Sequence, residues 1–91
     1  MSRLAVSLSA YKELGLIHSR ELLERVGSAI FDLVEDPFMP GTLDLDNNPG
    51  IRYVGIEDTY ILYCVAEPKE ADESREIIIL GVLNGYYHPL H

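Results

Sequence analysis

The feature that most constrains the fold is the apolar segment Glu76–Leu83 (E-I-I-I-L-G-V-L). Its branched aliphatic side chains favour a β-strand. A strand without polar alternation is typical of the centre of a sheet that is covered on both faces. The apolar run is far too short to span a bilayer, which requires about 20 apolar residues in a helix. We therefore expect a soluble protein built around this strand.

The segment Arg20–Glu35 is the clearest helix in the sequence. Ser19 can cap its start, and Pro37 ends it because proline cannot continue the hydrogen-bond ladder. A shorter helix is expected over Ala10–Ile17 with Ser9 as its N-cap, so residues 10–35 form a helical hairpin. The apolar residues of the longer helix recur with a 3.6-residue period and form one stripe: Leu22, Leu23, Val26, Ile30, Leu33 and Val34.

Three further segments have the alternation or the composition of strands. Residues 37–50 contain three prolines and two glycines and are expected to form a loop. The resulting order β-α-α-β-β-β predicts an α+β fold, in which the helical hairpin packs on a curled, mainly antiparallel four-stranded sheet. Its 91 residues predict a single domain, residues 1–91. The three segments are Arg3–Ser9, with Leu4, Val6 and Leu8 on one face, and Ile51–Ile56 and Thr59–Ala66, joined by a tight turn at Glu57 and Asp58.

The charge and the cysteine content limit the classes of function. Fifteen acidic residues against seven lysines and arginines give a net charge of −8, which favours basic partners and disfavours strong binding to nucleic-acid phosphates. Cys64 is the one cysteine, so an intrachain disulfide is excluded, and we expect a buried structural thiol. The N-terminal residues lack the pattern of a signal peptide, so we expect a cytoplasmic protein without membrane association.

Residues 44–48 (D-L-D-N-N) resemble the start of an EF-hand calcium loop. The sixth position of such a loop requires glycine and the twelfth requires glutamate, but Pro49 and Gly55 stand there. We therefore expect no metal site and no cofactor.

Several short phrases occur in an order that spans nearly the whole chain. Taken together, they resemble the RelE/ParE superfamily of toxins from bacterial type II toxin–antitoxin modules, which includes plasmid-stabilisation proteins. The phrase that the family carries on its central hairpin is close to Asp-Tyr-Arg-Ile-Leu-Tyr, and four of its six positions match here. The phrases are Ser9-Ala10 with Lys12-Glu13-Leu14, Leu33 to Pro37 with Gly41 and Leu43 beyond, and Asp58-Thr59-Tyr60-Ile61-Leu62-Tyr63.

The resemblance implies a toxin-like protein that a cognate antitoxin neutralises. Its target would be ribosome-bound mRNA, which a ribonuclease member cleaves and so inhibits translation, or DNA gyrase, which a ParE-like member inhibits. RNA cleavage needs a base, an acid and cations around the phosphate. The resemblance nominates Arg52, Tyr87 and His88 as catalytic residues. Tyr60 and Tyr86 are candidates for substrate binding, with Tyr60 projecting toward the same surface as Arg52.

Other readings of these residues stay open. Arg52 can pair with Glu57, Asp58 or a loop acid, and the tail residues 86–88 can simply pack on the helices. Tyr60 and Tyr63 face opposite sides of their strand, and Tyr63 is expected in the core. The family's ribonucleases are usually basic and carry arginine where Tyr60 stands. The alternative function is therefore a catalytically degenerate, RelE-like protein-binding module without toxin activity, and a homo-oligomer is also allowed.

Overall fold

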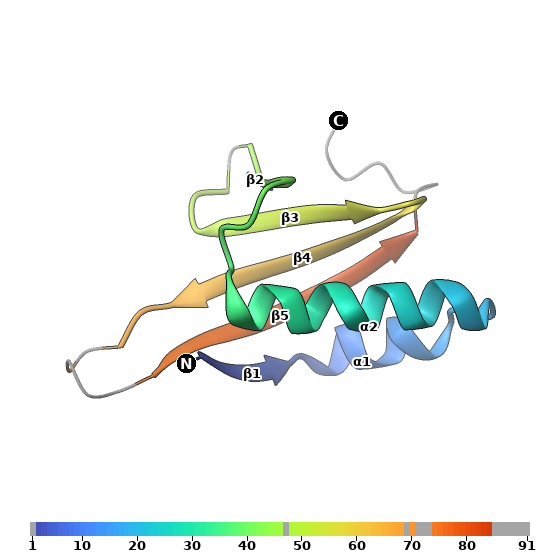
Figure 1. Cartoon of the computed structure of the whole chain (residues 1–91), viewed down its shortest axis with the longest axis horizontal. Coiled ribbons are helices and arrows are strands. Elements are labelled where there is room, and N and C mark those ends of the chain that lie inside the picture. Colours follow the sequence, from blue (N-terminus) through green and yellow to red (C-terminus); the bar gives the residue numbers. More distant parts are fainter. Residues whose placement is uncertain (1, 47, 69, 71–73, 85–91) are drawn as a thin grey trace.

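Five strands form one mixed sheet, and two helices pack on it (Figure 1). The computed structural model describes residues 2–46, 48–68, 70 and 74–84. The strand order is β1-β5-β4-β3-β2, with β1 parallel to β5 and the other neighbours antiparallel. Along the chain the elements are β1 (Ser2–Val6), α1 (Leu8–Gly15), α2 (Arg20–Glu35), β2 (Thr42–Asp44), β3 (Ile51–Ile56), β4 (Thr59–Ala66) and β5 (Arg75–Asn84).

The predicted α+β class and the helical pair are confirmed, but the predicted number of four strands is wrong. The fifth strand, β2, lies inside the segment expected to be a loop. It pairs antiparallel with β3, so that Thr42 lies opposite Val54 and Asp44 opposite Arg52. A strand of three residues is too short to show a pattern of alternating polar and apolar residues. β2 is defined instead by its pairing with β3.

The boundary between β1 and α1 also differs from the prediction. The strand ends at Val6, and Ser7 rather than Ser9 caps the helix, since the Ser7 hydroxyl accepts a hydrogen bond from the Ala10 N–H at 3.0 Å. The longer helix begins and ends where the sequence predicts, and the Leu22 N–H donates to the predicted cap, Ser19.

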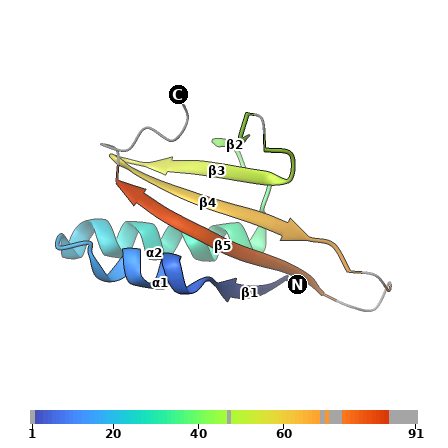
Figure 2. The same cartoon turned by 180° about the vertical axis from the view of Figure 1, so that it is seen from behind.

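The core lies between the helices and one face of the sheet. Ile77 and Ile79 of β5 point to this face and are fully buried, whereas Ile78 points to the other face and is half-buried. β5 is internal, between β1 and β4, but within the described part of the chain the helices cover only one of its faces, so the expected cover on both sides is not found there (Figure 2). The buried apolar residues are Ala10, Val26, Ala29, Ile30, Leu33, Val54, Ile61, Tyr63, Ile77, Ile79 and Val82.

A bulge in β5 keeps its apolar residues on the helix side. Leu62 lies opposite Gly81 and Tyr63 opposite Ile79, so Leu80 is the extra residue. The bulge shifts the alternation by one residue. As a result, Val82 joins the buried isoleucines of the same strand in the core.

Candidate functional site

Arg52 lies on the helix-covered face of β3 and is held there by three side chains. Its Nη1 donates to Asp44 Oδ1 and its Nη2 to Thr42 Oγ1, each at 2.8 Å, and its Nε donates to the Tyr63 hydroxyl at 3.3 Å. Its guanidinium also stacks over the Phe38 ring, 4.9 Å from the centroid. The alternative that Arg52 forms an ion pair with a loop acid is confirmed: the acid is Asp44, in the segment that the sequence predicted to be a loop.

Tyr63 links this cluster to the end of α2. Its hydroxyl accepts from Arg52 and donates to the backbone carbonyl of Pro37, two residues beyond the end of the helix. The side chain is fully buried, which confirms it as the core member of the Tyr60 and Tyr63 pair. The hydrogen bond to Tyr63, followed by the Asp44 carboxylate, raises the pKa of Arg52 above its ordinary value, so the guanidinium stays charged.

Tyr60 lies on the opposite, open face of the sheet. Its neighbour across the strands is Gly55, and its ring makes an edge-to-face contact with Tyr53, with centroids 6.3 Å apart. Arg52, in contrast, is paired with Tyr63 and points toward the helices. The expectation that Arg52 and Tyr60 project toward the same surface is therefore wrong, because residues of opposite parity leave a strand on opposite sides.

The open face is apolar and aromatic rather than basic. Among the described strand residues, Arg3 at the edge is the one cation that shares this face, and Glu76 lies opposite it on the neighbouring strand. Burial raises the pKa of the Cys64 thiol on this face, and Glu76 adds to the effect. The strand register places these residues on it: Arg3, Ala5, Leu43, Ile51, Tyr53, Gly55, Tyr60, Leu62, Cys64, Ala66, Glu76, Ile78, Gly81 and Leu83.

The remaining predicted site residues, Tyr86, Tyr87 and His88, lie outside the described residues. Within the described part of the chain, no three histidine, cysteine, aspartate or glutamate side chains are grouped so that they could hold a metal ion. No described helix has the length and apolar character needed to cross a membrane.

A second candidate site is the edge of the molecule formed by β1, α1 and α2. The outer edge of β1 pairs with no other described strand, since β5 is its neighbour on the inner side. Leu4 and Val6 of this strand are 42% and 39% exposed although they point to the helix-covered face. We name this the β1-side surface, and define it by the exposed apolar residues of the three elements: Leu4, Val6, Leu8, Tyr11, Leu23 and Phe31.

The two flanks of α2 differ in character. Arg25 forms an ion pair of 2.8 Å with Glu57 in the β3–β4 turn, which places the polar flank of the helix toward β3. By the 3.6-residue period of the helix, Leu23 and Phe31 project away from the side of Arg25, and Phe31 is 71% exposed. A free strand edge beside exposed apolar side chains is the usual place for pairing with another chain.

The residues around Arg52 and the β1-side surface were not identified from sequence as parts of a site. Asp44 and Thr42 belong to the short strand that alternation could not reveal. The alternation of the first strand and the stripe of the long helix predict that Leu4, Val6, Leu8 and Leu23 face the interior, whereas the structure leaves all four exposed.

Two solved structures share this fold along 90% of the chain. The first is the toxin–antitoxin complex RelBE2 from Mycobacterium tuberculosis, at 20% identity, 95% coverage of that chain and a TM-score of 0.71. The second is a free, double arginine-to-alanine mutant of the E. coli toxin RelE, at 17% identity, 81% coverage and a TM-score of 0.67. No family model and no curated protein matches the sequence. The fold expected from the resemblance is thus confirmed.

Proposed function

We propose that this protein is the toxin-like component of a type II toxin–antitoxin module and that a cognate antitoxin binds it on the β1-side surface. The observation that carries the proposal is the fold, which matches a chain of a solved toxin–antitoxin complex over 90% of this chain. The cellular target proposed for such a protein is ribosome-bound mRNA or DNA gyrase.

The β1-side surface supports the docking half of this proposal. An extended antitoxin segment can add a strand to the outer edge of β1, and an amphipathic helix can cover the apolar residues of α1 and α2. Both modes suit a segment that folds on binding, because the surface provides backbone hydrogen bonds and apolar area together. Lysine substitutions test it: Val6→Lys and Phe31→Lys should each weaken antitoxin binding.

A matched control lies at the opposite edge of the sheet. Leu43 of β2 is 55% exposed, comparable with the apolar residues of β1, but it points to the open face. Leu43→Lys adds the same charge to the same chain and should leave antitoxin binding unchanged. Equal weakening by all three substitutions would point to net charge rather than to the β1-side surface.

The position of Arg52 favours a second candidate function, the catalytically degenerate protein-binding module. A cation that stabilises a phosphate in RNA cleavage must be free to contact it, whereas Arg52 is tied to Asp44, Thr42 and Tyr63 on the helix-covered face. The open face adds a single cation among the described strand residues, Arg3. In this case the chain binds its partner but does not arrest growth.

Expression in cells that lack the antitoxin separates the two functions. Growth arrest that coexpression of the protein from the adjacent reading frame relieves supports the toxin, and stable copurification without arrest supports the binding module. If growth arrest occurs, Arg52→Lys and His88→Ala should reduce it for an mRNA interferase. Folding of the Arg52 variant must be checked by circular dichroism, since this residue also holds β2. Arrest with altered plasmid supercoiling and intact mRNA would instead support gyrase inhibition.

A further inference from the structure

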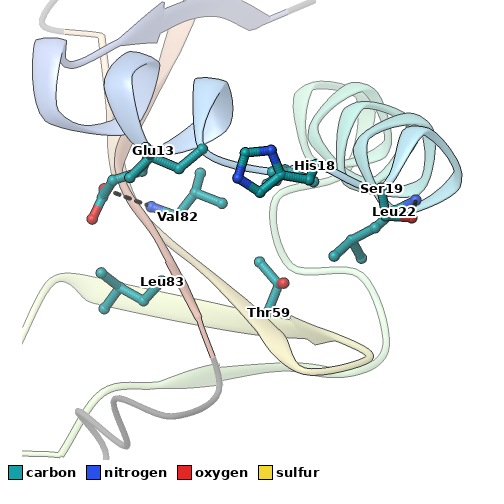
Figure 3. Close-up of a pocket in the computed structure, with 9 residues that line it drawn as sticks. Glu13, His18, Ser19, Leu22, Thr59, Val82 and Leu83 are labelled. Atoms are coloured by element: carbon teal, nitrogen blue, oxygen red, sulfur yellow. Dashed lines mark hydrogen bonds between the residues drawn. The ribbon is translucent and has the colours of Figure 1, made fainter.

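A pocket of about 570 Å³ lies where the connection between α1 and α2 meets the ends of β4 and β5 (Figure 3). Most of its wall is apolar, and a few polar side chains stand among the apolar ones, which is the usual composition of a ligand site. The polar residues are Glu13, His18, Ser19 and Thr59, and the apolar ones are Leu16, Ile17, Leu22, Val82 and Leu83.

Thr59 presents a buried hydroxyl to this pocket. The residue is 5% exposed, and its side chain points into the space between Glu13 and Leu22 (Figure 3). A hydroxyl can both donate and accept a hydrogen bond, so a ligand in the pocket can bond to the Thr59 side chain.

Glu13 adds a negative charge to the same wall. Its Oε1 accepts from the Val82 N–H at 3.0 Å, and the residue is half-buried. The two ion pairs found within the described residues, Arg25–Glu57 and Arg52–Asp44, do not include it. A partly buried carboxylate without a cation favours a positively charged ligand, because the ligand restores the interactions that burial removed.

We propose that this pocket binds the side chain of a lysine or arginine presented by a protein partner. The aliphatic stem would pack against Leu16, Leu22 and Leu83, and the cationic head would bind Glu13 and Thr59. The net charge of −8 draws basic partners toward the chain. The proposal deepens the proposed function, and it rests on that function only in taking the partner to be a protein.

The test uses two capped amino acids that differ in their charge. N-acetyl-lysine N-methylamide is titrated into the full chain at about pH 8. We expect saturable NMR shifts at Thr59, Leu22 and Val82. N-acetyl-norleucine N-methylamide keeps the aliphatic stem without the ammonium group, and we expect it to bind at least about tenfold more weakly.

Two variants assign the contacts. Glu13→Gln keeps an oxygen for the Val82 N–H but removes the charge, so it should weaken the lysine probe about tenfold and leave the norleucine probe unchanged. Thr59→Val keeps the shape of the side chain without the hydroxyl, and should weaken the lysine probe by a smaller factor. Unchanged lysine binding in both variants would overturn the assignment.

Three other outcomes would also overturn the proposal. The first is equal binding of the two probes, and the second is tighter binding of free n-butylammonium than of capped lysine, which would indicate a small amine ligand. The third is that neither probe binds the unmodified chain. If the probes bind only after Tyr86→Ala and Tyr87→Ala, the proposal also fails, because the chain's own tail is then the occupant of the pocket. None of these experiments contains the antitoxin, so their failure leaves the proposed function to its own test.

Discussion

The carboxylate of Glu13 accepts a hydrogen bond from the backbone N–H of Val82, at 3.0 Å, and joins α1 to the edge of β5. The pairing of β1 with β5 ends where Val6 meets Ile79. Beyond that point the Ser7 N–H and hydroxyl donate to the carbonyls of Ile79 and Leu80. The N-cap Ser7 and the side chain of Glu13 therefore bond to the backbone of β5 beyond the point where its pairing with β1 ends.

Glu13→Ala should expose this edge. The substitution removes the acceptor of the Val82 N–H and is expected to lower the free energy of unfolding by about 1 kcal/mol. Hydrogen exchange of the Val82 amide should become faster than in the unmodified chain. Glu13→Gln retains an acceptor oxygen and serves as the control; if it accelerates exchange at Val82 as much as Glu13→Ala, the hydrogen bond does not stabilise this edge.

Tyr63→Phe should destabilise the fold more than its small change in size suggests. The substitution leaves the carbonyl of Pro37 and one donor of Arg52 without their partner in a buried place. We expect a loss of about 1–3 kcal/mol in urea unfolding. Tyr60→Phe removes the same group from the open face and should change the stability by less than about 0.5 kcal/mol. Equal effects would show that the Tyr63 hydroxyl has no special role.

Arg52→Lys should loosen β2 from β3. A lysine cannot reproduce the separate bonds of the guanidinium to Asp44, Thr42 and Tyr63, so we expect a loss of about 1–2 kcal/mol. Asp44→Asn should cost less than about 1 kcal/mol, because the Asp44 side chain is 80% exposed. Urea unfolding of both variants checks this order, and a larger loss for Asp44→Asn would contradict it.

Cys64 should react slowly with alkylating reagents. Burial, with a further contribution from Glu76, raises the pKa of its thiol, so the reactive thiolate is scarcer at about pH 8 than in an exposed cysteine. The alkylation rate should rise with pH, and this rise should occur at higher pH than for the cysteine of a model peptide. Glu76→Gln removes the nearby negative charge and should lower the pKa and speed the reaction. An unchanged rate profile in this variant would exclude Glu76 as a cause.

The sequence was most informative where a segment determines its own structure. The apolar stripe of residues 20–35, with Ser19 before it and Pro37 after it, was enough to place α2. The alternation along β4 was enough to put Tyr60 and Tyr63 on opposite faces, with Tyr63 expected in the core. The sequence was less informative where another part of the chain decides. β2 exists because β3 pairs with it, Ser7 caps α1 because β5 holds its backbone, and the face on which Arg52 lies follows from strand register.

The most direct test of the account is hydrogen exchange of the chain alone and with the protein encoded by the adjacent reading frame. We predict that the partner slows exchange in residues 2–11 and 20–35, which contain the β1-side surface, and leaves β3 and β4 nearly unchanged. Protection confined to residues 51–66, with β1 exchanging as in the free chain, would contradict the proposed docking surface.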